Sequence, residues 1–270
     1  MLQPFIISDT ISYDIRLTME RAGDSIMKYL IGLYCVVFLL ILSGCDEIEI
    51  DTPVEVKAND IVMANTENSQ LSYNLPPPET KGAISVEEAL ASRRSRRNFQ
   101  DKELSVEKLS QILWAAYGIS EPGRGLRTAP SAGATYPLEI HVAVGKVAGV
   151  EPGVYRYDPH GHKIIRTVDR DIRGALSDAA LSQTMVRDAP VTVIHTAIFE
   201  RIAGYGDRGR ERYVFMEIGH SAQNIYLQAE TLGLGTCAIG AFMDDRVKDL
   251  LRLPADEEPL YLMPVGYTRN

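Results

Sequence analysis

Two periodicities of apolar and polar residues run along the chain, and together they predict a mixture of helices and strands. The longest helical pattern covers residues 211–232 and ends at Gly233. A second helix is predicted from Ser105, its N-cap, to a stop at Gly118. A shorter helix begins with the capping-box pattern Ser-Val-Glu-Glu at 85–88.

Runs of β-branched and aliphatic residues predict the strands. Residues 138–144 and 191–196 are typical of buried strands, and residues 260–265 form the last predicted strand. Residues 154–157 and 163–168 flank a Pro-His-Gly turn, which indicates a β-hairpin. Helices and strands do not alternate regularly, and the sequence contains no Gly-x-Gly-x-x-Gly. The pattern therefore favours an α+β fold over a doubly wound sheet, and it argues against a Rossmann nucleotide site.

The N-terminal part of the chain has a different pattern. Residues 29–42 form an uncharged apolar run. This run is short for a membrane span of roughly 20 residues but fits the apolar region of a signal peptide, about 7–15 residues long. Lys28 precedes it, and Leu-Ser-Gly-Cys at 42–45 resembles the lipobox of bacterial lipoproteins, in which Cys45 would be lipidated. The alternative is a plain transmembrane anchor that ends by chance in Ser-Gly-Cys.

These features divide the chain into four parts. Residues 1–26 contain four acidic residues, unlike the start of a signal peptide, so we predict that they are a mis-assigned start and that translation begins at Met27. Residues 27–45 are then the lipoprotein signal peptide. Residues 46–81 are polar and interrupted by prolines, which predicts a flexible tether. Residues 82–270 are predicted to fold as the functional domain.

Charge and cysteine content narrow the possible functions. The net charge of −8 argues against nucleic acid as a partner. Of the three cysteines, Cys35 lies in the apolar run and Cys45 is the predicted lipid site, so only Cys237 belongs to the domain. An intrachain disulfide is therefore excluded for the mature domain.

Against this acidic background, four arginines lie within five residues. They are Arg93, Arg94, Arg96 and Arg97, and Ser95 stands among them. Several guanidinium groups beside a hydroxyl suit a phosphate or another compact anion. A solvated basic surface is the simpler interpretation of an arginine run considered alone, so other segments must decide between the two.

Three separated segments together resemble the nitroreductase family. Arg-Arg-Ser-x-Arg-x-Phe at 93–99 is similar to its first flavin-binding segment. Pro-Ser-Ala-Gly-Ala-Thr-Tyr-Pro at 130–137 and Leu-Gly-Leu-Gly-Thr at 232–236 resemble its SagB/ThcOx-type branch, which includes azoline oxidases of peptide natural products. The resemblance extends from about residue 75 to the C-terminus. It implies a mostly antiparallel sheet flanked by helices, an intertwined homodimer and FMN as the cofactor.

The resemblance also implies a set of flavin-binding residues. In the first segment, Arg96 and Asn98 fall on variable positions. The loop 130–133 is expected to line the flavin, often from the other subunit, and residues 236–242 are expected to pass over the ring with a backbone amide facing flavin N5. The implied cofactor-binding residues are Arg93, Arg94, Ser95, Arg97, Pro130, Ser131, Ala132, Gly133, Ala238, Ile239, Gly240, Ala241 and Arg269.

Tyr205 is the catalytic residue that the resemblance implies. In the azoline-oxidising branch a Lys-Tyr pair precedes a Gly-Asp-Arg-Gly-like run and serves in proton transfer. Here Tyr205 precedes such a run, but Gly204 stands at the lysine position. The tyrosine can still donate or accept a proton, whereas the missing lysine argues against azoline oxidation. Cys237 has no adjacent cation to lower its pKa and is interpreted as structural.

These interpretations predict an FMN-dependent oxidoreductase that reduces or dehydrogenates a small organic or peptide-derived substrate. Hydride would pass through flavin N5, and NAD(P)H or another donor would supply electrons. The alternative is a membrane-anchored flavin- or ligand-binding lipoprotein without turnover. In either case, lipidation of Cys45 would hold the protein on a membrane of the bacterial cell envelope, facing away from the cytoplasm.

Overall fold

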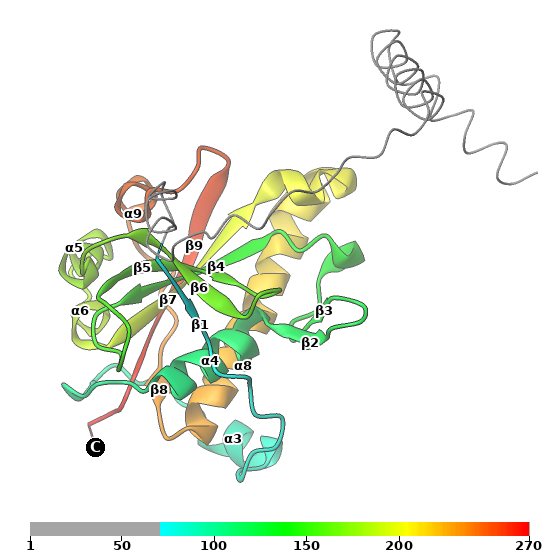
Figure 1. Ribbon diagram of the computed structural model, residues 1–270. Coiled ribbons are helices and arrows are strands. Elements are labelled where there is room, and N and C mark those ends of the chain that lie inside the picture. Colours follow the sequence, from blue (N-terminus) through cyan, green and yellow to red (C-terminus); the bar gives the residue numbers. More distant parts are fainter. Residues whose placement is uncertain (1–70, 270) are drawn as a thin grey trace, which may run out of the picture. The chain divides into compact units, whose positions relative to one another are not determined.

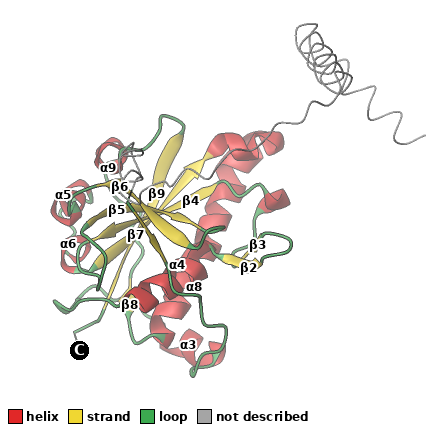
Figure 2. Cartoon of the chain, viewed as in Figure 1, coloured by secondary structure: helices red, strands yellow, loops and turns green. Residues whose placement is uncertain are grey.

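The computed structural model describes residues 71–269 of the chain. The predictions for the start site, the signal peptide, Cys45 and most of the tether lie outside these residues. Figures 1 and 2 show a central sheet with helices packed on both of its faces. The predicted α+β class is confirmed.

A seven-stranded sheet forms the centre of the domain. Its strands are β1 (Ser72–Asn74), β4 (Leu138–Val144), β5 (Gly153–Asp158), β6 (Lys163–Val168), β7 (Val191–Ile198), β8 (Gly235–Thr236) and β9 (Glu257–Gly266). Their order is β1-β6-β5-β4-β7-β9-β8, and every neighbouring pair is antiparallel. The predicted hairpin is the β5–β6 pair. A separate two-stranded sheet consists of β2 (Ile119–Glu121) and β3 (Leu126–Arg127).

Three helices carry the clearest sequence signals. They are α3 (Val86–Ser92), α4 (Val106–Tyr117) and α8 (Val214–Thr231). The predicted capping box is present, since the Ser85 hydroxyl accepts a bond from Glu88 N at 3.1 Å and Glu88 accepts one from Ser85 N at 2.8 Å. Gly118 ends α4 as predicted, and a Cβ at that position would lie 2.4 Å from the Trp114 side chain. The other helical segments are α5 (Arg173–Ala179), α6 (Met185–Asp188), α7 (Gly206–Arg208), α9 (Asp244–Leu251), η1 (Ala132–Ala134), η2 (Phe199–Tyr205) and η3 (Gly209–Tyr213).

Apolar side chains on the two faces of the sheet form two separate cores. On one face, Val142 and Val144 of β4 pack with the buried sides of α4 and α8. On the other face, Ala143 packs with α5, α6 and α9. Successive residues of a strand point to opposite faces, so neighbouring residues of β4 contribute to different cores.

The boundary predicted for the tether is wrong at its C-terminal end. β1 pairs with β6, and Leu75 directly after it is only 7% exposed. The carbonyl of Pro76 accepts a hydrogen bond from the Ser110 hydroxyl at 2.6 Å. Backbone pairing places no demand on apolar side chains, so this short polar strand leaves little trace in the sequence. The folded domain therefore includes residues 71–81.

Within residues 71–269, no helix is both long enough and apolar enough to cross a bilayer. Cys237 is buried and forms no disulfide. Burial raises the pKa of its thiol, although the Arg97 charge opposes the shift. A thiol in this environment is a weak nucleophile, in agreement with the structural interpretation of Cys237.

Candidate functional site

The arginine segment, residues 93–97, leaves α3 and runs beside β8. Ser95 and Thr236 form a parallel bridge. Directly after the segment, the carbonyl of Asn98 accepts a hydrogen bond from Arg269 N at 2.9 Å. The structure thus brings together three of the four predicted flavin-binding regions: the arginine segment, the chain that follows β8, and the C-terminal arginine.

Tyr226 of α8 joins two of these regions. Its hydroxyl lies 3.0 Å from the Ser95 hydroxyl and accepts a hydrogen bond from Ala238 N at 2.9 Å. The Arg93 guanidinium lies 5.1 Å from the centre of its ring, within cation–π range. Tyr226 was not among the predicted site residues, because in the sequence it appears only as one more residue of an amphipathic helix.

The four arginines differ in their partners. Arg96 forms an ion pair with Glu230, with 3.4 Å between Nε and Oε1. The Arg94 guanidinium donates to two backbone carbonyls at the end of α3, at 3.1 and 2.7 Å. Among residues 71–269, no carboxylate pairs with Arg93 or Arg97. The arginine at the variable position is therefore the one that forms an ion pair, and the guanidinium groups of Arg93, Arg94 and Arg97 have no carboxylate partner among the described residues.

The predicted segment 238–241 connects β8 to α9 along the edge of the sheet. Ile239 and Leu262 exchange two backbone hydrogen bonds, at 2.9 and 3.0 Å. The Ile239 side chain is buried in the second core and its backbone N–H is used by Leu262, so neither is available to a ligand. Gly240 and Ala241 are exposed. The backbone here is fixed by the sheet, and its surface carries only small side chains.

The fourth predicted region is the loop segment, residues 130–133, which contacts Tyr205 and not the arginine segment. Gly133 has a φ of +60°, and a Cβ added there would lie 2.4 Å from the Tyr205 hydroxyl. Tyr205 is 45% exposed, and its ring packs edge-on against Tyr213 with 5.4 Å between centres. The structure therefore brings the predicted catalytic tyrosine to the predicted flavin-lining loop.

A buried polar network next to this loop was missed by sequence reasoning. The Tyr117 hydroxyl donates to Glu217 Oε1, while Glu217 Oε2 has no hydrogen-bond partner among the described residues. Burial raises the pKa of Glu217, and the hydrogen bond from Tyr117 and the nearby Ser131 hydroxyl oppose the shift. Burial and the neighbouring Glu217 also raise the pKa of Tyr117. The Arg127 guanidinium lies 4.3 Å from the centre of the Tyr117 ring.

Within one chain, these two groups of residues contact different parts of α8. Tyr226 holds the arginine segment, and Glu217 lies beside the loop segment. They are nine residues apart on α8, which is roughly 14 Å along a helix that rises 1.5 Å per residue. The two groups of residues therefore lie apart within one chain, and we call them the arginine half-site and the loop half-site.

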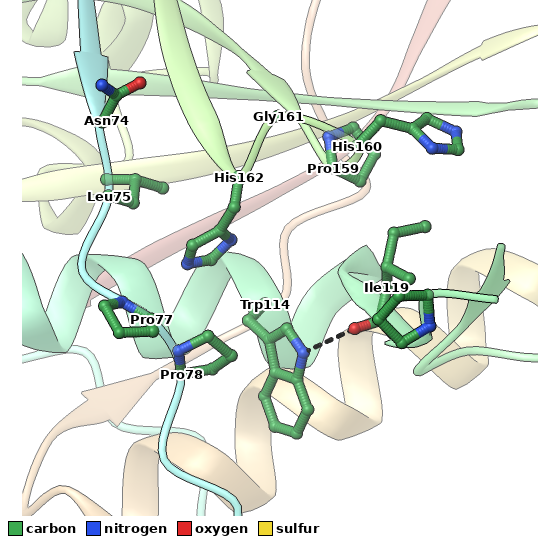
Figure 3. Close-up of a pocket in the computed structure, with 11 residues that line it drawn as sticks. Asn74, Leu75, Pro77, Pro78, Trp114, Ile119, Pro159, His160, Gly161 and His162 are labelled. Carbon is green, nitrogen blue, oxygen red and sulfur yellow. Dashed lines mark hydrogen bonds between the residues drawn. The ribbon is translucent and has the colours of Figure 1, made fainter.

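Figure 3 shows a cavity of about 460 Å³ that belongs to neither half-site. Its walls include Pro77, Pro78 and Trp114, and the Trp114 indole donates to the carbonyl of Ile119 at 3.0 Å. None of the predicted flavin-binding residues lines this cavity. We therefore place the candidate site at the two half-sites and not here.

Comparisons with known proteins test the family and the fold of the chain. Residues 90–267 match the model of the Nitroreductase family. The chain is 50% identical over 184 residues to "Putative nitroreductase MJ1384" of Methanocaldococcus jannaschii, which covers 68% of this chain and 91% of that protein. A crystal structure from Ralstonia eutropha with the same description is 29% identical, covers 74% of this chain and 90% of that one, and has a TM-score of 0.64.

A relative with a more specific name is the trifolitoxin-processing protein TfxB of Rhizobium leguminosarum. It is 29% identical over 201 residues, which are 69% of this chain and 53% of TfxB. The chain therefore spans about half the length of that relative. The family match over most of the domain, together with the half-identical archaeal relative, shows that this chain belongs to the nitroreductase family, a family of flavin-dependent oxidoreductases.

Proposed function

We propose that the chain is an FMN-dependent oxidoreductase whose flavin lies between two subunits of a homodimer. The arginine segment of one subunit and the loop segment of the other would face the same flavin. The observation that carries this proposal is the difference among the arginines: Glu230 neutralises Arg96, whereas Arg93 and Arg97 have no acidic partner within residues 71–269. Cations left available beside a hydroxyl suit a phosphate.

The residues at the arginine half-site fit FMN in shape as well as in charge. Gly240 and Ala241 leave the surface open to a flat ring, and the sheet fixes the backbone at Ile239. Arg269 is exposed next to the end of the arginine segment and adds a further cation. FMN bound there would supply hydride transfer at its N5 atom.

Each residue would have a definite task. Arg93 and Arg97 would hold the phosphate or the pyrimidine edge of the ring, and Ser95 would stay oriented by Tyr226. Tyr205 would hold a proton at its hydroxyl, next to Gly133. Gly204 offers no side chain to activate that proton, so we favour reduction of a small organic acceptor, with NAD(P)H as donor, over azoline oxidation. Because the chain is similar to the trifolitoxin-processing protein TfxB, the proposed acceptor can also be a peptide-derived molecule.

Exposed apolar side chains support the dimer. On and just before α3, Ile84, Val86 and Leu90 are 40%, 62% and 53% exposed. At the start of α8, Phe215 and Met216 are 51% and 57% exposed. Exposed large apolar side chains on two elements are consistent with burial against another chain. A second chain would cover them and would also bring a loop segment to each arginine segment.

The shared site can be tested with mixed dimers. We expect Arg97→Ala and Gly133→Val each to yield homodimers without flavin, because each change damages both sites. If two differently tagged variants are co-expressed and the heterodimer is isolated, one site carries both changes and the other carries none. The heterodimer should then hold about half of the wild-type flavin, since a two-fold dimer contains two equivalent sites.

Two observations would contradict the shared site. A heterodimer of these variants that lacks flavin would mean that each chain builds its site alone, and a monomeric holoprotein would exclude the dimer. As a matched control, an Arg96→Ala and Gly133→Val heterodimer should hold about half of the flavin under either arrangement. Absorbance and mass spectrometry test for bound FMN. If the wild-type protein neither contains FMN nor takes it up, the proposed activity is wrong.

We also propose, from the sequence, that Cys45 is lipidated and anchors the protein in the bacterial cell envelope. The support is the apolar run of residues 29–42 followed by Leu-Ser-Gly-Cys. Cys45→Ala should move the protein out of the membrane fraction or leave its signal peptide uncleaved. Unchanged fractionation and mass of that variant would refute the anchor.

A further inference from the structure

A second cavity, of about 330 Å³, lies next to the loop segment. This volume is at the lower end of the range of roughly 300–1,000 Å³ typical of small-molecule sites. Tyr117, Tyr136 and Tyr157 contribute aromatic walls, and Leu138 and Ile140 of β4 add aliphatic ones. The cavity thus combines an apolar surface with the charged groups described next.

The charges around the cavity do not balance. Arg127, Arg156 and Arg201 line it together with two acids, Glu139 and Asp158. Glu139 pairs with both Arg201, at 2.6 Å, and Arg156, at 3.7 Å. Asp158 is 3.8 Å from Lys163. Arg127 forms no ion pair among residues 71–269. Its charge acts on the nearby Glu217, but that carboxyl group is hydrogen-bonded to Tyr117 instead.

Arg127 also has unused hydrogen-bond donors. A guanidinium carries five N–H groups. Here Nη1 donates to the carbonyl of Tyr117 at 3.4 Å, and the buried Nε has no partner among the described residues. The rings of Tyr117 and Tyr136 lie 4.3 and 4.7 Å from the guanidinium and hold it in place. A cation fixed in advance loses little conformational freedom when a ligand binds.

We infer that this cavity is a binding site for a small aromatic carboxylate, whose charged group pairs with Arg127 and whose ring lies among the tyrosines. Three arginines and two acids line the cavity, so its lining carries one excess positive charge, which matches a monoanion. Glu139 and Asp158 would repel a dianion such as phosphate, which selects against it. A planar carboxylate can also accept two parallel hydrogen bonds from a guanidinium. The inference concerns a site other than the arginine half-site and holds whether or not the protein carries flavin.

The test is calorimetric titration of the full-length protein with benzoate and with benzamide, its neutral analogue of nearly the same shape. A charge-assisted hydrogen bond contributes about 1.5–3 kcal/mol, so benzoate should bind at least about tenfold more tightly than benzamide. Arg127→Gln should reduce the affinity for benzoate to that for benzamide. Arg127→Lys, which keeps the charge but lacks the fork, should fall between wild type and Arg127→Gln.

Two controls separate this site from general charge effects and from the arginine half-site. Arg124→Gln removes the same charge three residues away, from an exposed arginine that faces Glu121 at 3.6 Å and does not line the cavity. Arg97→Ala removes an arginine of the other half-site. Both variants should bind benzoate as the wild type does.

Several results would overturn the inference. They are equal affinities of the wild type for benzoate and benzamide, undiminished benzoate binding by Arg127→Gln, and inorganic phosphate binding more tightly than benzoate. If Arg127→Gln fails to fold, judged by circular dichroism, the comparison of the two ligands on both the wild type and Arg97→Ala still decides the question.

Discussion

The arginine segment and the loop segment satisfy their charges in different ways. Next to the loop segment, Glu217 is almost completely buried and accepts a hydrogen bond from the Tyr117 hydroxyl of the same chain. In the arginine segment, Arg97 is exposed and has no acidic partner among the described residues. A charged group that is removed from water needs a partner within the fold. An exposed charged group is solvated by water and needs no partner in the protein. The backbone is held by the chain's own hydrogen bonds in both regions, so the difference lies in the side chains.

This contrast explains why a count of arginines is a poor guide to the site. Arg96 stands between two predicted ligand residues, yet Glu230 engages it. Arg94 turns back to the carbonyls of α3. Neighbouring residues with the same side chain therefore have different roles, and the acids and carbonyls around them decide which role each one takes.

The largest expected effect tests this contrast directly. Arg93→Ala or Arg97→Ala should weaken FMN binding by about ten- to a hundredfold, because a charge-assisted hydrogen bond contributes about 1.5–3 kcal/mol. Arg96→Ala, whose guanidinium already faces Glu230, should keep nearly the wild-type affinity. Fluorescence titration of the flavin-free proteins measures all three. If the three variants and the wild type bind FMN with equal affinity, the arginine segment is not a specific flavin-binding site.

A smaller effect is expected at the helix that presents the arginine segment. Ser85→Ala deletes the hydroxyl that caps α3 and should lower the free energy of unfolding by about 1 kcal/mol. Urea denaturation measures the loss. Ser92→Ala, at the other end of α3, removes a hydroxyl that bonds back to the carbonyls of Glu88 and Ala89 within the helix, and it should change stability less. A larger loss for Ser92→Ala would show that the capping box does not hold this helix.

The smallest effect concerns the loop segment and depends on pH. Burial raises the pKa of Glu217 above its ordinary value, so the folded state holds the proton more tightly than the unfolded state. The contribution of Glu217 to stability is therefore complete below that ordinary pKa and is lost as pH rises through the folded-state pKa. Glu217→Gln should remove this decline, which a series of thermal unfolding curves from acid to neutral pH would reveal. Parallel curves for variant and wild type would contradict it.

Glu257 provides a control of opposite sign. Burial alone would raise its pKa, but the hydrogen bond and charge of His141, 2.7 Å away, keep the pKa of Glu257 below its ordinary value. Its stabilising contribution is present above that ordinary pKa and is lost as pH falls through the folded-state pKa. Glu257→Gln should therefore flatten the acid side of the stability curve, whereas Glu217→Gln flattens the side toward neutral pH.

Local patterns predicted most of the fold, and contacts between distant residues account for what they missed. The capping box at Ser85 and the stop at Gly118 are set by neighbours within a few positions, and both are confirmed. Strand β1 was missed because its three residues, Ser-Tyr-Asn, are defined by the partner β6 and not by their own alternation.

The candidate site divides in the same way. The resemblance to a known family supplied the arginine segment, the segment 238–241 and Arg269, and the structure brings these together. Tyr226 and Glu217 could not be predicted, because their partners Ser95 and Tyr117 are 131 and 100 positions away in the sequence. Their roles exist only once α8 has packed against the rest of the domain.

The short strand β1 has a consequence for solubility. It covers residues 163–165 of β6, and the carbonyl of Leu71 accepts a hydrogen bond from Arg166 N at 2.8 Å. Without this cover, β6 would present a row of unpaired backbone groups that another chain could join as an added strand. We expect β1 to oppose aggregation, because it occupies the pairing positions of residues 163–165 on β6. Its three residues are themselves too few to form a long exposed edge strand.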